Sequence, residues 1–241
     1  MKPFASRRAR DVRAWLAIGA LATCAMVVLS TRVGSAASGA FVSSSWTHAS
    51  LGAIDGHVFG LALGAVSCAV RLGAVPDPTT LTVIDYSKPS NAKRLWVFDL
   101  RSHSLLYEEL VAHGKGSGDN FATAFSNDPE SHQSSLGLFE TEDTYTGKNG
   151  YSLRLKGLDA GFNDKALARA IVMHGAPYVS ENFAKSRGRL GRSWGCPALR
   201  EAVAREIIDR IRATGLLFAY YPDQKWLTSS RFLGGCSTPA T

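Results

Sequence analysis

From Leu81 onward the chain consists of short runs rich in β-branched and aromatic residues, separated by polar turns. The runs "RLWVFDL" and "LLYEELVAHG" flank the polar turn "RSHS", which predicts a hairpin. Further strands are predicted in "LTVIDYS", "SSLGLFETEDTYTG", "YSLRLKGLD" and "LLFAYYPD", and "ALARAIVMHGA" ends in a buried strand from Ile171 to His174. This succession predicts one β-rich domain with few helices, from about Leu81 to Leu233.

Two stretches predict helices. The apolar run "HVFGLALGAVSCAVRLGAV", ended by "PDP", is typical of a packed helix. A membrane segment is the alternative, but Arg71, the flanking His57 and the modest length favour a core helix. Downstream, a helix with one apolar face is predicted, ending at Thr214-Gly215. Its apolar residues are Leu199, Val203, Ile207, Ile208 and Ile211.

The first 37 residues have the order of an export signal. The basic start "MKPFASRRARDVR" precedes the apolar run "AWLAIGALATCAMVVLS", and the small residues Ser35 and Ala37 are placed for cleavage after Ala37. The apolar run is short for a membrane span. An uncleaved N-terminal anchor that holds the chain at a membrane is the alternative, and in either case we expect an exported protein.

The net charge of +7 is concentrated in this leader. Residues 1–37 contain six basic residues and one acidic residue, so the rest of the chain carries a net charge of only +2. A protein that binds nucleic acid needs a basic excess to neutralise phosphates. The charge distribution therefore argues against nucleic acid as a partner.

Cysteine usage is informative in an oxidising compartment. Removal of the leader would leave Cys68, Cys196 and Cys236. An odd number leaves one thiol outside any intramolecular bridge. If Cys196 stays reduced, Cys68–Cys236 is the only permitted pair, and three free thiols are the alternative.

The stretch "GRLGRSWGCPALRE" places Cys196 between Gly195 and Pro197. Pro197 suits the first position of a helix, because its φ is already helical and its missing N–H would be unpaired there. That would put Cys196 at the N-cap, where the helix dipole stabilises a thiolate and lowers the thiol pKa. The motif therefore predicts a nucleophilic cysteine. A cysteine that only caps a helix or fills a core gap is the alternative.

A nucleophilic cysteine usually needs a base. His174 and His113 are the candidates, because each ends an apolar strand and precedes a glycine. His174 is nearer to Cys196 in the chain, but spacing alone does not decide between the two. The remaining histidines lie in less suitable places: His48, His57, His103 and His132.

Taken together, "HGA" at 174–176 and "GRSWGCPAL" at 191–199 resemble the catalytic motifs of the L,D-transpeptidase family, in its divergent murein L,D-transpeptidase branch. The segment "SSLGLFETEDTYTGKNGYSLRLKGLDAGFND" is similar to the one that precedes the His-Gly motif in this branch. The resemblance implies a β-rich α+β fold of the YkuD-like type. This is a mixed β-sheet or sandwich with the nucleophile at a helix N-terminus, preceded by a short helical segment.

With this resemblance the chain divides into four expected parts. These are an export signal or anchor (1–37), a linker and helical segment (38–80), an L,D-transpeptidase-like catalytic domain (81–233) and a C-terminal tail (234–241).

The resemblance also implies the roles of individual residues. Cys196 is expected to be the nucleophile and His174 the general base. The Gly175 carbonyl would orient the imidazole. Backbone N–H groups near Trp194, Gly195 and Cys196 would form the oxyanion hole.

Departures from the commoner family pattern affect substrate preference. Trp194 stands where a histidine is usual, and Pro197-Ala198 follow the cysteine where arginine or asparagine is often found. Ser193 and Arg192 are expected to contact the substrate, with Arg192 pairing with a carboxylate. A solvated loop arginine is the alternative for Arg192.

The implied substrate is the stem peptide of peptidoglycan, in the periplasm or cell envelope. Cys196 would form a thioester and release D-alanine, and an amine of another stem would then complete a cross-link. If water is the acceptor, the chain is an L,D-carboxypeptidase or another thiol-dependent peptidoglycan hydrolase. A non-catalytic wall-binding protein is a further alternative.

No cofactor and no metal are expected. A zinc site that joins Cys196 to His113, His132 or His174 is disfavoured, because no CxxC, HxxxH or HExxH spacing supports it.

Overall fold

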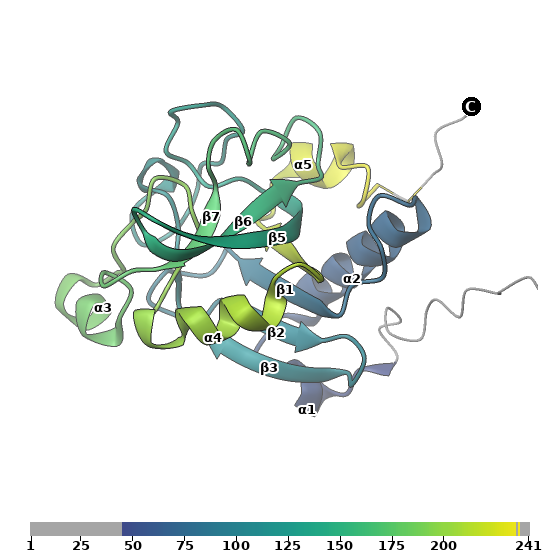
Figure 1. The fold of residues 1–241 in the computed structure, drawn as a ribbon, viewed down its shortest axis with the longest axis horizontal. Coiled ribbons are helices and arrows are strands. Elements are labelled where there is room, and N and C mark those ends of the chain that lie inside the picture. Colours follow the sequence, from purple (N-terminus) through teal and green to yellow (C-terminus); the bar gives the residue numbers. More distant parts are fainter. Residues whose placement is uncertain (1–44, 235, 237–241) are drawn as a thin grey trace, which may run out of the picture. The chain divides into compact units, whose positions relative to one another are not determined.

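The computed structural model describes residues 45–234 and residue 236 (Figure 1). The strands are β1 (Thr80–Asp85), β2 (Leu95–Asp99), β3 (Ser104–Glu109), β4 (Val111–Ala112), β5 (Gly137–Gly147), β6 (Gly150–Gly157), β7 (Val172–Gly175), β8 (Ala198–Leu199) and β9 (Gly215–Tyr220). The helices are α1 (His48–Leu51), α2 (Gly56–Arg71), α3 (Glu181–Arg187), α4 (Glu201–Ile211) and α5 (Gln224–Ser229), with a 3-10 turn η2 (Lys115–Ser117). The predicted β-rich α+β class is confirmed.

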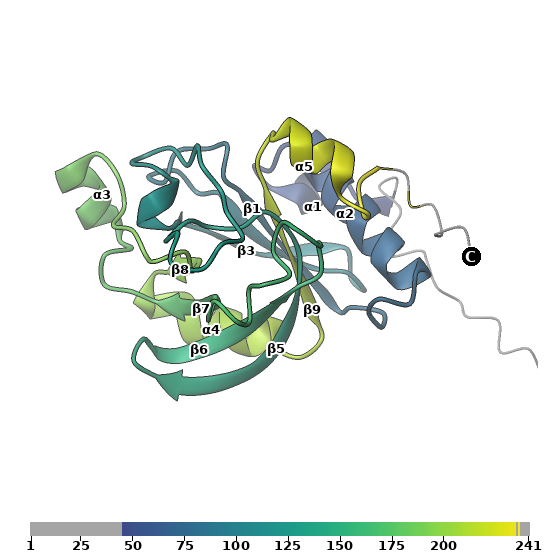
Figure 2. The same cartoon turned by 90° about the horizontal axis from the view of Figure 1, so that it is seen from above.

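The strands form one nine-stranded mixed sheet in the order β3-β2-β1-β9-β5-β6-β7-β8-β4. The pairs β1–β9 and β7–β8 are parallel, and the other pairs are antiparallel. The two edge strands, β3 and β4, are consecutive in the chain and are separated only by Leu110. The sheet therefore curves back until its two edges nearly meet (Figure 2).

Arg94, directly before β2, reinforces this closure. Its buried Nε and Nη2 donate to the carbonyl of Val111 at 3.1 and 2.9 Å, and its Nη1 donates to the carbonyl of Lys88 at 2.9 Å. Burial lowers the pKa of Arg94 to about 10. Backbone carbonyls thus offset the cost of burying this charge and tie β4 back to the opposite end of the sheet.

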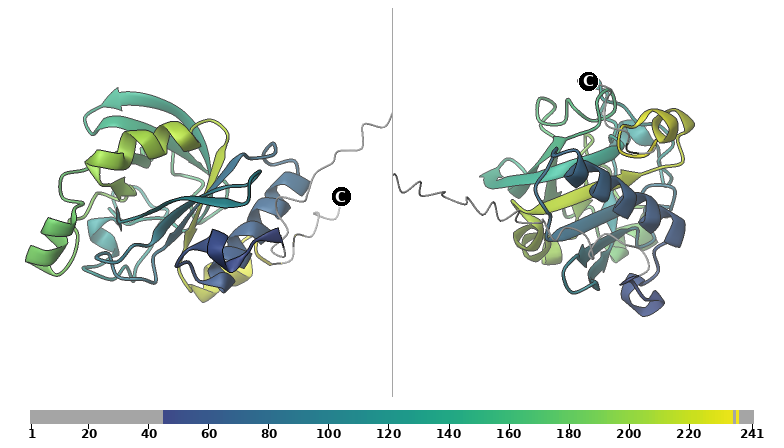
Figure 3. Two further views of the ribbon diagram at one scale, coloured as in Figure 1. Left: turned by 90° about the horizontal axis from the view of Figure 1, so that it is seen from below. Right: turned by 90° about the vertical axis from the view of Figure 1, so that its right-hand side faces the viewer.

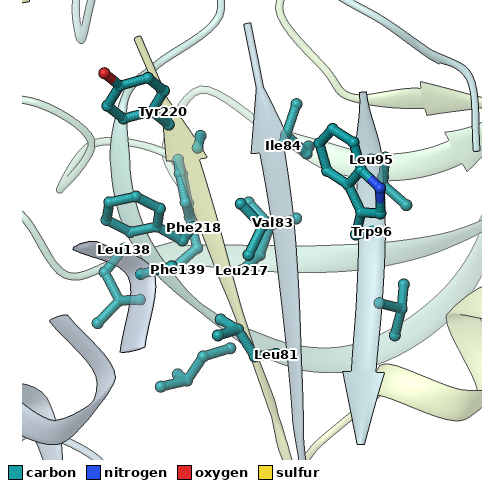
Figure 4. Close-up of a cluster of buried hydrophobic side chains, with 14 of the residues drawn as sticks. Leu81, Val83, Ile84, Leu95, Trp96, Leu138, Phe139, Leu217, Phe218 and Tyr220 are labelled. Atoms are coloured by element: carbon teal, nitrogen blue, oxygen red, sulfur yellow. The ribbon is translucent and has the colours of Figure 1, made fainter. Parts of the chain in front are cut away.

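The centre of the sheet is buried on both faces. Every residue of β1 and β9 is buried, which requires cover on both sides. Helix α4 packs against β7, β6 and β1 on one side, and α2 packs against β1 and β9 on the other (Figure 3). In Figure 4, Val83 of β1 lies beside its register partners, Trp96 of β2 and Phe218 of β9.

Helix α2 is a core helix. Asp55 caps its start by accepting from the N–H groups of His57 and Val58, and Phe59 and Leu63 are among its buried residues. In the part of the chain that the structure describes, no helix is both long enough and apolar enough to cross a membrane. The expectation that this segment packs in the core is confirmed.

A disulfide joins Cys68 of α2 to Cys236, with Cα atoms 5.4 Å apart. It closes a loop across 168 residues and ties the C-terminal segment to α2. Cys196 is the free cysteine of the described residues. The structure therefore selects the bridged arrangement over the three free thiols.

The predicted placement of Cys196 at a helix N-terminus is wrong. Helix α4 begins at Glu201 with Arg200 as its N-cap, and the segment before it forms β8. Parallel pairing of β8 with β7 sets His174 opposite Ala198 and draws the chain into a strand. This long-range pairing overrides the helix-starting preference of Pro197. It also places Leu199 in β8 and not on the face of α4.

The export signal or anchor predicted for residues 1–37, and the start of the linker, lie outside the described residues. The predicted division at residue 81 remains a prediction. What the structure describes is that α2 shares one hydrophobic core with the strands that follow it.

Candidate active site

Neighbouring parallel strands bring His174 and Cys196 to one pocket. His174 belongs to β7, and Cys196 lies two residues before Ala198 of the adjacent β8. The pocket has a volume of about 390 Å³. Its lining residues are Lys148, Asn149, His174, Tyr178, Arg192, Ser193, Trp194 and Cys196.

Cys196 is only 8% exposed, and its sulfur lies against the start of β7. The Val172 N–H donates to Sγ at 3.5 Å, and Sγ lies 3.7 Å from the Ala170 carbonyl oxygen. Burial raises the pKa of Cys196, and the Val172 N–H and the charge of Arg169 act in the opposite direction. The pKa shift is therefore opposite to the expected lowering, because Cys196 precedes β8 instead of capping α4 and burial favours the neutral thiol.

His174 is held in the tautomer that a base needs. Its Nδ1 lies 2.8 Å from the Gly175 carbonyl oxygen. A carbonyl only accepts, so Nδ1 carries the proton and Nε2 keeps its lone pair. Burial lowers the pKa of His174, so the ring is neutral at pH 7. Gly175 thus occupies the position expected of it.

His174 and Cys196 line the same pocket. Within the described part of the chain, no hydrogen bond joins His174 to Cys196. Catalytic contacts are often long in a structure without substrate and tighten when substrate binds.

The residues Ser193–Cys196, here called the cysteine turn, bond to one another. The Ser193 hydroxyl donates to the Cys196 carbonyl at 2.6 Å and accepts from the Gly195 N–H at 3.1 Å. The Gly195 N–H, which is expected to help form the oxyanion hole, thus already has a partner within the turn, and its oxyanion role stays a prediction. The Ser193 hydroxyl proton, expected to face substrate, is likewise committed to the turn.

Two backbone N–H groups of the cysteine turn, those of Trp194 and Cys196, are available for a ligand. Within the described ranges, no other residue accepts from the N–H of Trp194 or Cys196. The Cys196 N–H faces its own sulfur. These two groups are the remaining candidates for holding an oxyanion.

The cysteine turn packs against a loop to which the sequence analysis assigned no role. Residues 126–135, here called the wall loop, contact Gly195. The Ser134 hydroxyl donates to the Gly195 carbonyl at 3.0 Å. Gly195 has φ +120°, and a Cβ there would lie 2.8 Å from the Gln133 carbonyl oxygen. Glycine at 195 therefore allows the backbones of the cysteine turn and the wall loop to pack closely.

Arg192 lies at the pocket with its charge already paired. Its Nη1 contacts Asp119 Oδ1 at 2.7 Å and donates to the Gly118 carbonyl at 3.0 Å. Arg189 lies 3.8 Å from the same carboxylate. A substrate carboxylate would therefore have to compete with Asp119 for Arg192.

Trp194 is the most exposed large hydrophobic residue that the structure describes, at 65%. Its ring centroid lies 4.9 Å from that of His132, and Lys115 Nζ lies 5.1 Å from it. The side chain thus forms an aromatic rim on the pocket.

His113, the rival base, lies outside the pocket and is fully buried. Arg94 Nη2 lies 2.7 Å from its Nδ1, and its Nε2 lies 3.3 Å from the Gly118 carbonyl oxygen. Burial and the Arg94 charge lower its pKa to about 4. The structure therefore separates the two candidates that spacing had left open.

Three pocket residues were not identified from the sequence. Tyr178 follows β7, and Lys148 and Asn149 form the turn between β5 and β6. The turn itself is readable as "GKNG" between two predicted strands. Its approach to Cys196 depends on the curvature of the sheet, which has no local sequence signal. Among the described residues, no group of three His, Cys, Asp or Glu side chains is placed to hold a metal ion.

Solved structures that are similar to the chain include the following three. The first is an L,D-transpeptidase from Mycobacterium smegmatis, with 14% identity, 60% of this chain and 59% of that chain covered, and a TM-score of 0.38. L,D-transpeptidase 3 from Mycobacterium tuberculosis, in complex with a faropenem-derived adduct, has 11% identity, coverage of 60% and 61%, and a TM-score of 0.39. The helical cell shape determining protein Pgp2 from Campylobacter jejuni has 13% identity, coverage of 67% and 57%, and a TM-score of 0.36.

The matched region thus spans about three fifths of each of these structures. A comparison with curated proteins found no match. The family model of the L,D-transpeptidase catalytic domain matches residues 52–220, more than two thirds of the chain. The chain therefore belongs to the L,D-transpeptidase catalytic domain family.

Proposed function

We propose that this protein is a cysteine acyltransferase that cross-links peptidoglycan stem peptides. One observation carries the proposal beyond family membership: a neutral imidazole with a free Nε2 and a buried thiol line the same pocket. The base and its orienting carbonyl come from β7, and the nucleophile comes from the segment that leads into the adjacent β8. Thiol-dependent acyl transfer needs these three groups at one site.

In the first step, Cys196 Sγ attacks the carbonyl at the L-centre that precedes a terminal D-alanine. His174 Nε2 accepts the thiol proton, and the N–H groups of Cys196 and Trp194 stabilise the oxyanion. The imidazolium then returns the proton to the leaving amine of D-alanine, and a thioester on Cys196 remains.

In the second step, an amine of a neighbouring stem attacks the thioester. His174 takes a proton from the amine and returns it to the departing Cys196 sulfur, so the neutral thiol is regenerated and a new amide joins the two stems. Hydrolysis of the same thioester would give an L,D-carboxypeptidase, so the acceptor alone distinguishes the two activities.

Burial of Cys196 has a consequence for this mechanism. Because the resting thiol is neutral, the proton moves to His174 as the carbon–sulfur bond forms, and not beforehand. Binding of a peptide in the pocket would bring the reacting groups into contact.

We also propose export to the periplasm or cell envelope, with residues 1–37 as signal or membrane anchor. The Cys68–Cys236 disulfide supports an oxidising compartment.

The test is incubation of the purified protein with a disaccharide tetrapeptide, followed by mass spectrometry of the products. Cross-linked dimers and free D-alanine are expected, with none from Cys196→Ala. Trimmed monomers alone would identify a carboxypeptidase. Absence of any Cys196-dependent product would refute the proposal.

A further inference from the structure

Arg169 binds the wall loop with both arms of its guanidinium. Nη1 donates to the Ser126 carbonyl at 2.7 Å and to the Ser135 hydroxyl at 2.6 Å. Nη2 donates to the Gln133 carbonyl at 2.7 Å and to the Ser131 hydroxyl at 3.1 Å. One side chain therefore connects four points of a ten-residue loop to the segment that enters β7.

The wall loop in turn supports the cysteine turn. The Gln133 carbonyl that Arg169 holds is the oxygen that lies against Gly195. The Ser134 hydroxyl accepts from the Gly114 N–H at 3.1 Å and donates to the Gly195 carbonyl. A displacement of the loop would therefore move the backbone that carries the Cys196 N–H.

Arg169 also lies next to the residue that contacts the sulfur. Ala170 has φ +53°, a strained conformation for a residue with a Cβ, and its carbonyl oxygen faces Cys196 Sγ at 3.7 Å. Such strain is maintained only where surrounding contacts impose it. In the described part of the chain, no ion pair joins Arg169 to a carboxylate.

The other groups that face the thiol carry no charge at pH 7. Burial raises the pKa of Tyr86 and raises that of Tyr178 to about 12, so both phenols are protonated. Burial lowers the pKa of His174, so its ring is neutral. The charge of Arg169 lowers the pKa of Cys196, against the larger effect of burial.

Charged residues around these groups are otherwise engaged or distant from the sulfur. Arg192 lines the pocket and pairs with Asp119. Lys148 lines the pocket from the exposed turn between β5 and β6. Asp128 acts on Arg169 through its charge but forms its ion pair with Lys165.

We propose that Arg169 is a positioning residue of the active site, which clamps the wall loop against Gly195 and holds an unpaired cation beside the Cys196 thiol. The inference rests on the proposed function, because positioning serves catalysis only if Cys196 is the nucleophile. Its two effects, geometry and charge, are separable by substitution.

The charge is tested with Arg169→Gln. The rate of Cys196 alkylation by iodoacetamide is measured across pH, which needs no peptidoglycan. Loss of the cation destabilises the thiolate, so the midpoint moves to higher pH and the rate at pH 7 falls about threefold or more. An unchanged midpoint in the folded variant overturns the electrostatic part.

The matched control is Lys165→Gln, which removes one cation from the same segment. Lys165 Nζ lies 4.0 Å from Asp128 and is not among the groups that act on Cys196. No shift of the alkylation midpoint is expected. A shift equal to that of Arg169→Gln would show a general charge effect and would also overturn the proposal.

The clamp is tested with variants that keep the charge. Arg169→Lys preserves the cation but loses the two-armed geometry. We expect its alkylation midpoint to stay near that of the wild type, while kcat for the muropeptide falls about tenfold with little change in KM. The double variant Ser131→Ala/Ser135→Ala removes two acceptors of the clamp and retains Arg169. It tests the clamp equally if Arg169→Lys does not fold.

Wild-type kcat in both charge-preserving variants would overturn the clamp. If the alkylation shifts occur but no variant and no wild-type protein turns over muropeptides, Arg169 stands as the residue that tunes the thiol and the proposed function fails. The reverse result, turnover with no effect of Arg169, refutes only this inference.

Discussion

Helix α2 with strands β1 and β9 is held by apolar burial, whereas the cysteine turn is held by polar bonds to its own residues and to the wall loop. In the first region every residue of β1 and β9 is buried, and a disulfide ties α2 to the C-terminal segment. In the second, Gly195 has positive φ, and so does Ala170, whose carbonyl oxygen faces the Cys196 sulfur. Stability is concentrated in the first region and strain in the second, which is the division expected of an active site.

The largest expected effect separates the two regions. Cys196→Ala should reduce turnover of a tetrapeptide muropeptide by at least about 10³-fold, because it removes the proposed nucleophile, the free thiol of the described residues. Its thermal midpoint should stay close to that of the wild type, since the sulfur makes only weak contacts. Substantial turnover by this variant in a mass-spectrometric assay would remove Cys196 from the mechanism.

The second prediction concerns the disulfide of the α2 region, whose removal should affect stability and not turnover. Cys68→Ser/Cys236→Ser should lower the free energy of unfolding by about 2–5 kcal/mol, since the bridge closes a long loop. Turnover at 25 °C should be unchanged, because the site lies in a different part of the sheet. Urea unfolding and kinetics of the same preparation measure both. A large loss of kcat in the folded variant would contradict the separation.

His113 tests whether a buried polar group outside the active-site pocket contributes to the stability of the fold. Its pKa is lowered from 6.5 to about 4 in the folded protein, so the unfolded chain binds more protons as the pH falls. The stability from the neutral ring is complete above pH 6.5 and is lost as the pH falls toward 4, by about 3 kcal/mol. Urea unfolding at both pH values should show a smaller loss for His113→Gln than for the wild type. Equal losses would refute the assignment.

The smallest effect concerns the contact between the cysteine turn and the wall loop. Gly195→Ala places a Cβ 2.8 Å from the Gln133 carbonyl oxygen, and φ +120° is unfavourable for alanine. We expect kcat to fall about 10²-fold by misplacement of the Cys196 N–H. Gly234→Ala is the control, because its nearest atoms lie at 3.6 Å. Wild-type kinetics for Gly195→Ala would show that the turn tolerates movement.

Much of the fold was predictable because its cause is local. The β-branched runs from Leu81, the core character of α2 and the amphipathic run that became α4 all follow from periodicity over a few residues. The start of α4 was not predictable. Pro197 favours a helix locally, and only the pairing of β8 with β7 decides that the chain continues as a strand.

The site divides in the same way. Cys196, His174 and Gly175 were identifiable from residue type and neighbours, since few side chains act as nucleophile and base. Three features of the site depend on the three-dimensional surroundings of the residues, and no local sequence pattern predicts them. They are the hydrogen bonds that Ser193 and Gly195 donate within the cysteine turn, the ion pair of Arg192 with Asp119, and the raised pKa of Cys196.

The sequence by itself determined the β-rich class and the chemical types available at the site, because both depend on short-range patterns of apolar and reactive residues. The tertiary structure decided which histidine shares a pocket with Cys196, which backbone N–H groups of the cysteine turn bond to no other described residue, and which side chain holds the wall loop. These depend on contacts between residues far apart in the chain, such as Ser134 with Gly195 across 61 positions. Curvature of the sheet creates such contacts, and curvature is a property of the whole fold.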